Sequence, residues 1–262
     1  MEATRSAPMR YLLLLISLWL ITFLLTRGAL YFTHLSEADG HFFSVFFTGL
    51  LYDLSFLVYA ALPLGLYLLV CPAKLWRLRL HRGLLRAVLF VSLFIMLFVA
   101  VAEWLFWDEF GVRFNFIAVD YLVYSDEVLN NILESYPIAL ILSVIALTAL
   151  VLMLALRKPL RQALDAPLPS GRQRLACIGA MAVLASACVL VINQDTPRGE
   201  GGNAYARELA SNGPYQFFAA FRNNELDYSQ FYGSLSEDES TKLIRAELQE
   251  PNARFVDQDP MS

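Results

Sequence analysis

The sequence predicts an all-α polytopic membrane protein, with five transmembrane helices and a helical tail outside the membrane. Of its 262 residues, 57% are hydrophobic and only 17% are charged, and the mean hydropathy is +0.51. A soluble domain would carry about 25% charged residues. The apolar residues gather in five long blocks before residue 195, whereas residues 195–262 have an ordinary polar composition. We therefore assign residues 1–194 to a membrane domain and residues 195–262 to an extracytoplasmic helical linker.

The five apolar blocks are the predicted membrane spans. They cover residues 11–32, 42–70, 84–106, 138–156 and 175–192. A helix rises 1.5 Å per residue, so the first block is about 33 Å long and can cross a hydrocarbon core of about 30 Å. Arg5 and Arg10 precede it, as in a secretory signal peptide, but the apolar run is too long and no small-residue cleavage site follows. We expect an uncleaved anchor.

Basic residues gather in alternate connectors. The connectors after the second and fourth blocks carry Lys74, Arg77, Arg79, Arg82, Arg86, Arg157, Lys158, Arg161, Arg172 and Arg174, with Asp165 as their one acid. The remaining connectors are acidic, and the one between the third and fourth blocks has six acids against Arg113. Positive charge favours the cytoplasmic side of a membrane. We therefore expect a cytoplasmic N-terminus and an extracytoplasmic tail.

The connector at residues 107–137 is predicted to be an amphipathic outer loop. A loop this long is usually functional, and aromatic side chains alternate here with acids. The candidate residues of an outer-loop interface are Trp104, Trp107, Phe114, Asn115, Phe116, Asp120 and Tyr121. Apolar residues recur every three or four positions between Asp120 and Leu133, which predicts a helix. That helix would either lie on the outer leaflet or only cap the helix bundle, and both alternatives stay open.

The tail is predicted to be helical and to cover an apolar surface. A helix is expected at 203–211, ended by Asn212 and Gly213, and Pro214 begins the next. A capping box at Ser236 predicts a last helix that ends near residue 249. The tail is strongly aromatic but too small for a core of its own. We expect it to cover the membrane surface, the bundle or a further domain.

Three ionisable residues lie inside the apolar blocks, where they are costly and often functional. They are Arg27, Asp53 and Glu103, all in the predicted outer half of the membrane, so they can converge. Together they would form either a pocket for a lipid headgroup, with Arg27 facing a phosphate, or a structural cluster built on an Arg27–Asp53 pair. Arg113, the one cation of the outer loop, is a further phosphate-contact candidate.

Other chemistry finds little support in the sequence. The motif HLSEADGH at residues 34–41 has a spacing that permits a metal clip, but short polar loops produce such clusters by chance, and no metal site is predicted. No metalloprotease, nucleophile-elbow or phosphate-loop motif occurs. The net charge of −4 does not indicate a basic surface that binds nucleic acid. No catalytic residue is assigned.

Two stretches carry a resemblance to a known family: FGVRFNFIAVDYLVYSDEVLNNILESYP at 110–137 and NAYARELASNGPYQFFAAFRNNELDYSQFY at 203–232. With the five spans, they resemble the N-terminal membrane half of the lipoteichoic-acid synthase-like phosphoglycerol transferases, in the sulfatase and alkaline-phosphatase superfamily. In that family an extracellular α/β domain follows, with a threonine nucleophile and a divalent metal, usually manganese. Those motifs have no matching positions here, so the resemblance implies no catalytic residue and no cofactor in this chain.

The resemblance implies a function in the bacterial inner membrane. The chain would anchor a phosphoglycerol transferase-like enzyme and position anionic glycerophospholipid, such as phosphatidylglycerol, at the outer face. It is expected to be inactive alone and without a nucleic-acid partner. Either the chain is a truncated or split gene product, or a separately encoded catalytic domain is its partner. The alternative is a non-catalytic membrane scaffold or lipid-binding protein that works through partners.

Overall fold

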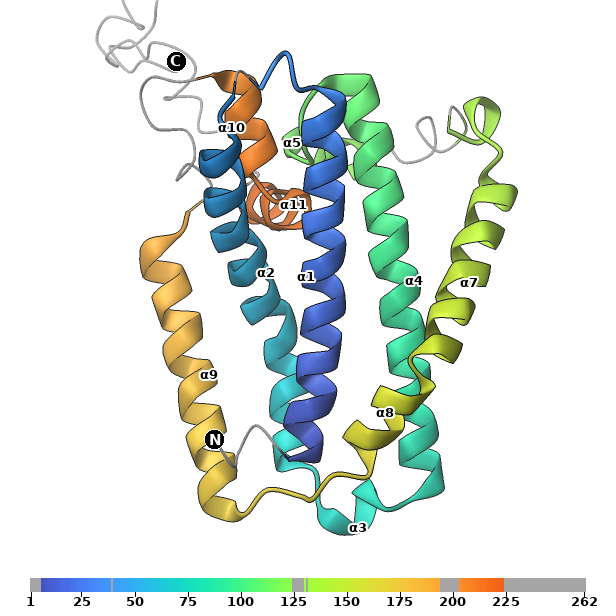
Figure 1. Ribbon diagram of the computed structural model, residues 1–262, viewed down its shortest axis with the longest axis vertical. Coiled ribbons are helices and arrows are strands. Elements are labelled where there is room, and N and C mark those ends of the chain that lie inside the picture. The colour runs from blue at the N-terminus through green and yellow to red at the C-terminus, as the bar shows by residue number, and fades with distance from the viewer. Residues whose placement is uncertain (1–5, 39, 124–129, 131, 194–202, 224–262) are drawn as a thin grey trace, which may run out of the picture. The chain divides into compact units, whose positions relative to one another are not determined.

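The chain forms helices long and apolar enough to cross a membrane five times, as shown by a computed structural model (Figure 1). The structure describes residues 6–38, 40–123, 130, 132–193 and 203–223, and within these ranges the regular structure is helical, without strands. The predicted all-α polytopic fold is confirmed. The chain divides into two compact units, Met1–Arg222 and Asn223–Ser262. All that follows concerns the first unit, and the helix expected near 236–249 lies outside the described residues.

The five long helices are α1 (Ala7–Thr33), α2 (Phe42–Val70), α4 (Arg79–Phe110), α7 (Ile138–Ala155) and α9 (Gly171–Val191). Helix α4 extends beyond the predicted 84–106 at both ends. It ends at Gly111, whose φ of +67° is the left-handed conformation that favours glycine after a helix, and whose N–H donates to the carbonyl of Trp107 at 2.8 Å. Helix α9 begins before the predicted residue 175 because Ser170 and Gln173 form a capping box.

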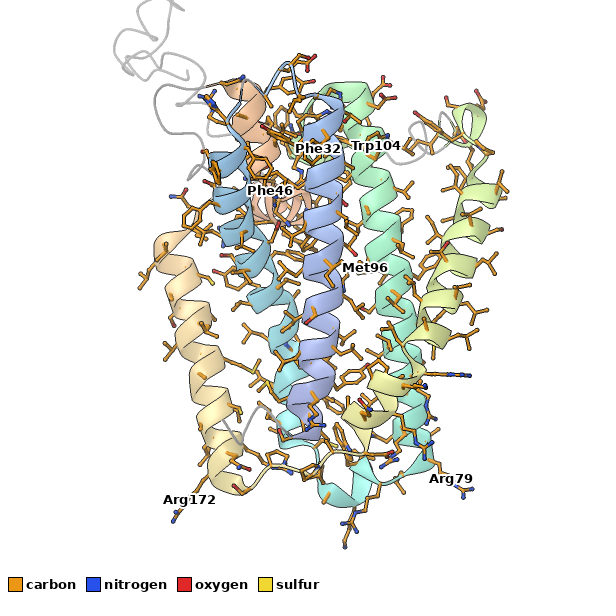
Figure 2. All side chains as sticks on the ribbon, in the orientation of Figure 1. Phe32, Phe46, Arg79, Met96, Trp104 and Arg172 are labelled. Atoms are coloured by element: carbon orange, nitrogen blue, oxygen red, sulfur yellow. The ribbon has the colours of Figure 1, made fainter. Side chains whose placement is uncertain are left out.

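The short helices lie at the two ends of the bundle. At the end that carries the labelled Arg79 and Arg172 in Figure 2 lie α3 (Ala73–Trp76) and α8 (Arg157–Leu164), and we call it the basic end. Near the opposite end lie α5 (Phe116–Val123), α10 (Ala204–Ala210) and α11 (Gly213–Arg222). The segment after the last span therefore returns to the bundle.

Helix α1 is central, because it packs against α2, α4, α8 and α10. Helix α9 packs on α2 and α7 packs on α4, so these two helices flank the bundle (Figure 1). Both expose most of their surface, as expected of helices that are apolar on all sides and face lipid. The buried core has two parts, one toward the basic end around Leu89 and one toward the opposite end around Leu30, Trp107 and Leu209.

Candidate functional site

The site is built around Arg27, which joins α1 to α2. Its Nη2 donates to Asp53 Oδ1 at 2.5 Å and to the carbonyl of Gly49 at 3.0 Å. A Cβ at Gly49 would lie 2.1 Å from Arg27 Cζ. Glycine is therefore required at residue 49, because only a residue without a side chain lets the guanidinium lie against the backbone of α2 and reach its carbonyl.

Arg27 also caps the C-terminal end of α10. Its Nη1 donates to the carbonyls of Leu209 and Ser211 at 2.7 and 2.8 Å. The last carbonyls of a helix lack partners within the helix and carry a partial negative charge. A buried cation at this position satisfies both requirements. A residue of the first transmembrane helix thus fixes the end of a helix about 180 positions later in the chain.

Asp53 binds the turn that follows α10. Its Oδ1 accepts a hydrogen bond from Asn212 Nδ2 at 2.7 Å. The other side-chain atom of that amide, Asn212 Oδ1, accepts from the backbone N–H of Tyr215 at 2.9 Å. Asn212 therefore acts as the N-cap of α11, and the same amide ties the start of α11 to the buried carboxylate of α2.

Glu103 and Arg113 hold the turn from the side of α4. Arg113 Nε lies 2.9 Å from Glu103 Oε1, and that carboxylate oxygen accepts the N–H of Gly213 at 3.0 Å. A carboxylate is favoured here because the first N–H groups of α11 have no partner within the helix. Arg113 Nη1 donates to the carbonyl of Ser211 at 2.5 Å. A Cβ at Gly213 would lie 2.2 Å from Glu103 Oε1, so any other residue at position 213 would displace this carboxylate from the N–H that it accepts.

We call these residues the turn-docking cluster: Arg27, Asp53, Glu103, Arg113, Ser211, Asn212 and Gly213. The four charged side chains are at most 1% exposed, and their formal charges sum to zero. Helical rise places Arg27, Asp53 and Glu103 about 9, 16 and 10 Å from the helix ends near α10. The polar turn is therefore buried between the long helices, away from their ends, where its backbone groups need polar partners.

Aromatic and polar contacts extend the docking around the cluster. Tyr52 and Tyr215 donate their hydroxyls to the carbonyls of Asn193 and Ile192, at 2.6 and 3.1 Å, and so bind the end of α9. Burial raises the pKa of Tyr215, which keeps its hydroxyl protonated as a donor. At the start of α10, Asn203 Oδ1 accepts from Tyr205 N at 2.8 Å, and its Nδ2 donates to the carbonyl of Glu37.

The structure brings together all four charges that the sequence singled out. The predicted Arg27–Asp53 pair is present, and Arg113 joins Glu103. The partner that sequence reasoning missed is the turn at 211–213. Its one sequence signal is Asn212-Gly213-Pro214, which predicts a boundary between helices and says nothing about burial. This geometry favours the structural alternative over an open headgroup pocket, because each of the four charged side chains is buried and bonds to the protein, although Arg27 Nε, Asp53 Oδ2 and Arg113 Nη2 have no hydrogen-bond partner.

The residues of the predicted outer-loop interface fall into two groups. Trp107 is buried against Tyr205 with ring centroids 5.3 Å apart, and Phe114 packs on Phe106 at 5.2 Å. Trp104, Phe116 and Tyr121 are exposed, whereas Asp120 and Asn115 are half-buried.

Helix α5 begins at Phe116, four positions before the predicted start, because Asn115 Oδ1 accepts from the backbone N–H of Ile117 at 2.9 Å. It packs against α11, so this part of the loop caps the bundle. Residues 124–129 and 131 of the predicted helix lie outside the described residues.

In the loop at residues 34–41, the ring of His34 contacts the last turn of α1. His34 Nδ1 lies 3.1 Å from the carbonyl of Leu30 and 2.9 Å from Thr33 Oγ1. Asp39 lies outside the described residues. Within the part of the chain that the structure describes, no group of three or more His, Cys, Asp or Glu side chains is placed to hold a metal ion.

No protein-family model, no curated protein and no solved structure matches this chain. The site and the fold therefore rest on the chain's own residues. The described residues define a membrane protein with five apolar helices of spanning length, in which the segment 203–222 docks on the bundle through buried charges.

The first prediction concerns Gly49. Gly49→Ala should lower the free energy of unfolding by about 1–3 kcal/mol, because the added methyl group displaces the Arg27 guanidinium. The measurement is denaturant or thermal unfolding of the purified protein in detergent. Gly28→Ala is the matched control, since a Cβ there meets nothing within 4 Å. Equal stability of the two variants would contradict the packing described here.

The second prediction concerns the Arg27–Asp53 pair. Arg27→Ala should destabilise the protein by about 3–5 kcal/mol, because it leaves Asp53 charged and buried without its cation. Adding Asp53→Asn should restore part of the loss in the same unfolding measurement, since the amide oxygen can still accept from Asn212. Rescue by Arg27→Lys but not by Asp53→Asn would favour a bound anion instead.

Proposed function

We propose that this chain is the membrane-anchoring and lipid-positioning module of a phosphoglycerol transferase-like enzyme. It would lie in the bacterial inner membrane with its basic end in the cytoplasm, because basic connectors stay on that side. The enzyme would act on anionic glycerophospholipid at the outer face. This assignment joins the resemblance of residues 110–137 and 203–232 to the geometry of the turn-docking cluster.

The observation that carries the proposal is the docking of the turn at residues 211–213. A segment that merely tethers a domain needs no fixed conformation. Here the segment after the last span is bonded to α1 by Arg27, to α2 by Asp53 and to Glu103 of α4. Three helices thereby set the position of α11. A fixed helix beside the bundle offers a defined surface for a catalytic domain, which a mere tether would not.

Lipid positioning is assigned to the exposed aromatic residues beside the cluster. Helix α11 exposes Phe218 and Phe221, α4 exposes Trp104, and α5 exposes Phe116. Phe218 also stacks near Phe56 of α2, with ring centroids 6.4 Å apart. Aromatic side chains prefer the interface between hydrocarbon and headgroups. These residues would contact the lipid there. The buried charges would fix the positions of the helices on which these residues lie.

The third prediction tests this function by headgroup transfer from a fluorescent phosphatidylglycerol with added manganese. Membranes that contain the chain alone should show no turnover, and turnover should appear when a catalytic domain of the phosphoglycerol transferase type is supplied. Gly213→Ala should reduce that turnover at equal amounts of folded protein, because a Cβ at residue 213 would collide with Glu103.

The control for this experiment is Gly179→Ala on α9, where a Cβ meets nothing within 4 Å. Turnover equal to wild type is expected for this control. Turnover by the chain alone would contradict the proposal. No turnover with any supplied domain would favour the alternative, a non-catalytic membrane scaffold or lipid-binding protein.

A further inference from the structure

A groove with a volume of about 260 Å³ lies at the basic end, away from the turn-docking cluster. Its lining comes from α1 (Arg10, Leu13, Leu14 and Ser17) and from α8 (Pro159 and Gln162). The proposed function assigns no role to this groove, and none of its residues belongs to the predicted outer loop or to the buried charges.

The sequence of α8 explains why a groove forms here. One face of this short helix is apolar, with Leu160 and Leu164 buried in the core near α1. The other face is exposed and basic, with Arg157 and Arg161. The backbone N–H of Ala7 donates to the carbonyl of Pro167 at 2.9 Å, which holds the start of α1 beside the segment after α8. Helix α8 therefore lies against α1 in the manner of an interfacial amphipathic helix.

The groove carries an uncompensated positive charge. Arg10 is exposed, and among the described residues its guanidinium makes no ion pair. The acid that the structure describes in this region, Asp165, already pairs with Arg82 at 2.7 Å and lies 3.5 Å from Arg161. The charge at the mouth of the groove is therefore available to an anion from outside the protein.

The groove changes from polar to apolar along its length. Arg10 lies in the first turn of α1, and Ser17 lies about 10 Å farther along the helix axis. Leu13 and Leu14 lie between them on α1, and Gln162 of α8 adds an amide to the lining. A cation near the start of α1 and an amide, with leucines farther along the helix, match a phosphate joined to an acyl chain. Basic pockets between transmembrane helices are known to bind anionic headgroups.

We propose that this groove binds one anionic glycerophospholipid from the leaflet at the basic end. The phosphate lies between Arg10 and Gln162, and one acyl chain follows Leu13 toward Ser17. The bound lipid fills the space between α1 and α8 and thereby stabilises the contact of α8 with the bundle. This site is independent of the outer-face chemistry, so its test does not depend on the enzyme to which the chain belongs.

The fourth prediction is tested by native mass spectrometry of the purified full chain, titrated with phosphatidylglycerol or phosphatidylcholine. Wild type should retain the anionic lipid in preference to the zwitterionic one. Arg10→Gln should weaken retention of phosphatidylglycerol about tenfold, the loss of one charge-assisted contact. Ser17→Phe should block both lipids, because it fills the groove from an exposed position of α1.

Arg172→Gln is the matched control, since it removes a cation at the same end but outside the groove (Figure 2). It should retain phosphatidylglycerol like wild type. Arg10 and Ser17 are both exposed, so their variants should elute like wild type and, without added lipid, unfold at the same temperature.

A competition with glycerol phosphate distinguishes a lipid headgroup from a soluble phosphate as the anion that binds. Glycerol phosphate, which lacks acyl chains, should fail to displace the bound lipid at equal concentration. A second outcome is that glycerol phosphate displaces the lipid in a way that Arg10→Gln weakens and Ser17→Phe does not. The groove would then be a site for a soluble phosphate and not for a lipid. Equal retention of the two lipids, or unchanged binding in both groove variants, would overturn the proposal.

Discussion

The five hydrogen bonds of the Arg27 and Asp53 side chains are the interaction on which the rest of the structure depends. Arg27 donates to Asp53, Gly49, Leu209 and Ser211, and Asp53 accepts a further bond from Asn212. Removing a single buried charge from water costs several kcal/mol even after relaxation. An arginine and an aspartate could offset each other as a pair, but the remaining donors of the guanidinium would stay unsatisfied. The carbonyls of Leu209 and Ser211 accept from the guanidinium, and Asn212 donates to the carboxylate, which leaves Arg27 Nε and Asp53 Oδ2 as the atoms of the pair without a hydrogen-bond partner.

Helices α10 and α11 in turn depend on Arg27 and Asp53. Helix α10 is short, and a helix of its length is marginal in isolation. Its C-terminal carbonyls are bonded to Arg27, and α11 begins at an asparagine bonded to Asp53. The two helices are therefore defined by groups that lie on other helices. The glycines at residues 49 and 213 follow from the same geometry, because each lies where a charged group meets backbone at close range.

Much of this fold could be predicted from the sequence, for physical reasons that particular residues illustrate. A span needs about 20 apolar residues to cross the hydrocarbon core, so the five spans stand out from composition alone. The convergence of Arg27, Asp53 and Glu103 was predictable because the three lie at similar depths. The end of α4 was not, since hydropathy ends near Phe106 whereas the helix continues to its glycine cap at Gly111. Burial of Asn212 was also hidden, because asparagine usually lies at the surface and its buried partner is 159 positions away.

The central claim is that the turn at residues 211–213 lies buried among the four charges. The most direct measurement is thiol labelling in lipid nanodiscs, with the native cysteines Cys71, Cys177 and Cys188 replaced by alanine. Ser211→Cys and Ser36→Cys are both nearly isosteric, and Ser211 is 4% exposed, whereas Ser36 is exposed in the loop after α1. The account predicts rapid labelling at residue 36 and strong protection at residue 211. Equal labelling rates at the two positions would show that the turn does not dock, and would contradict it.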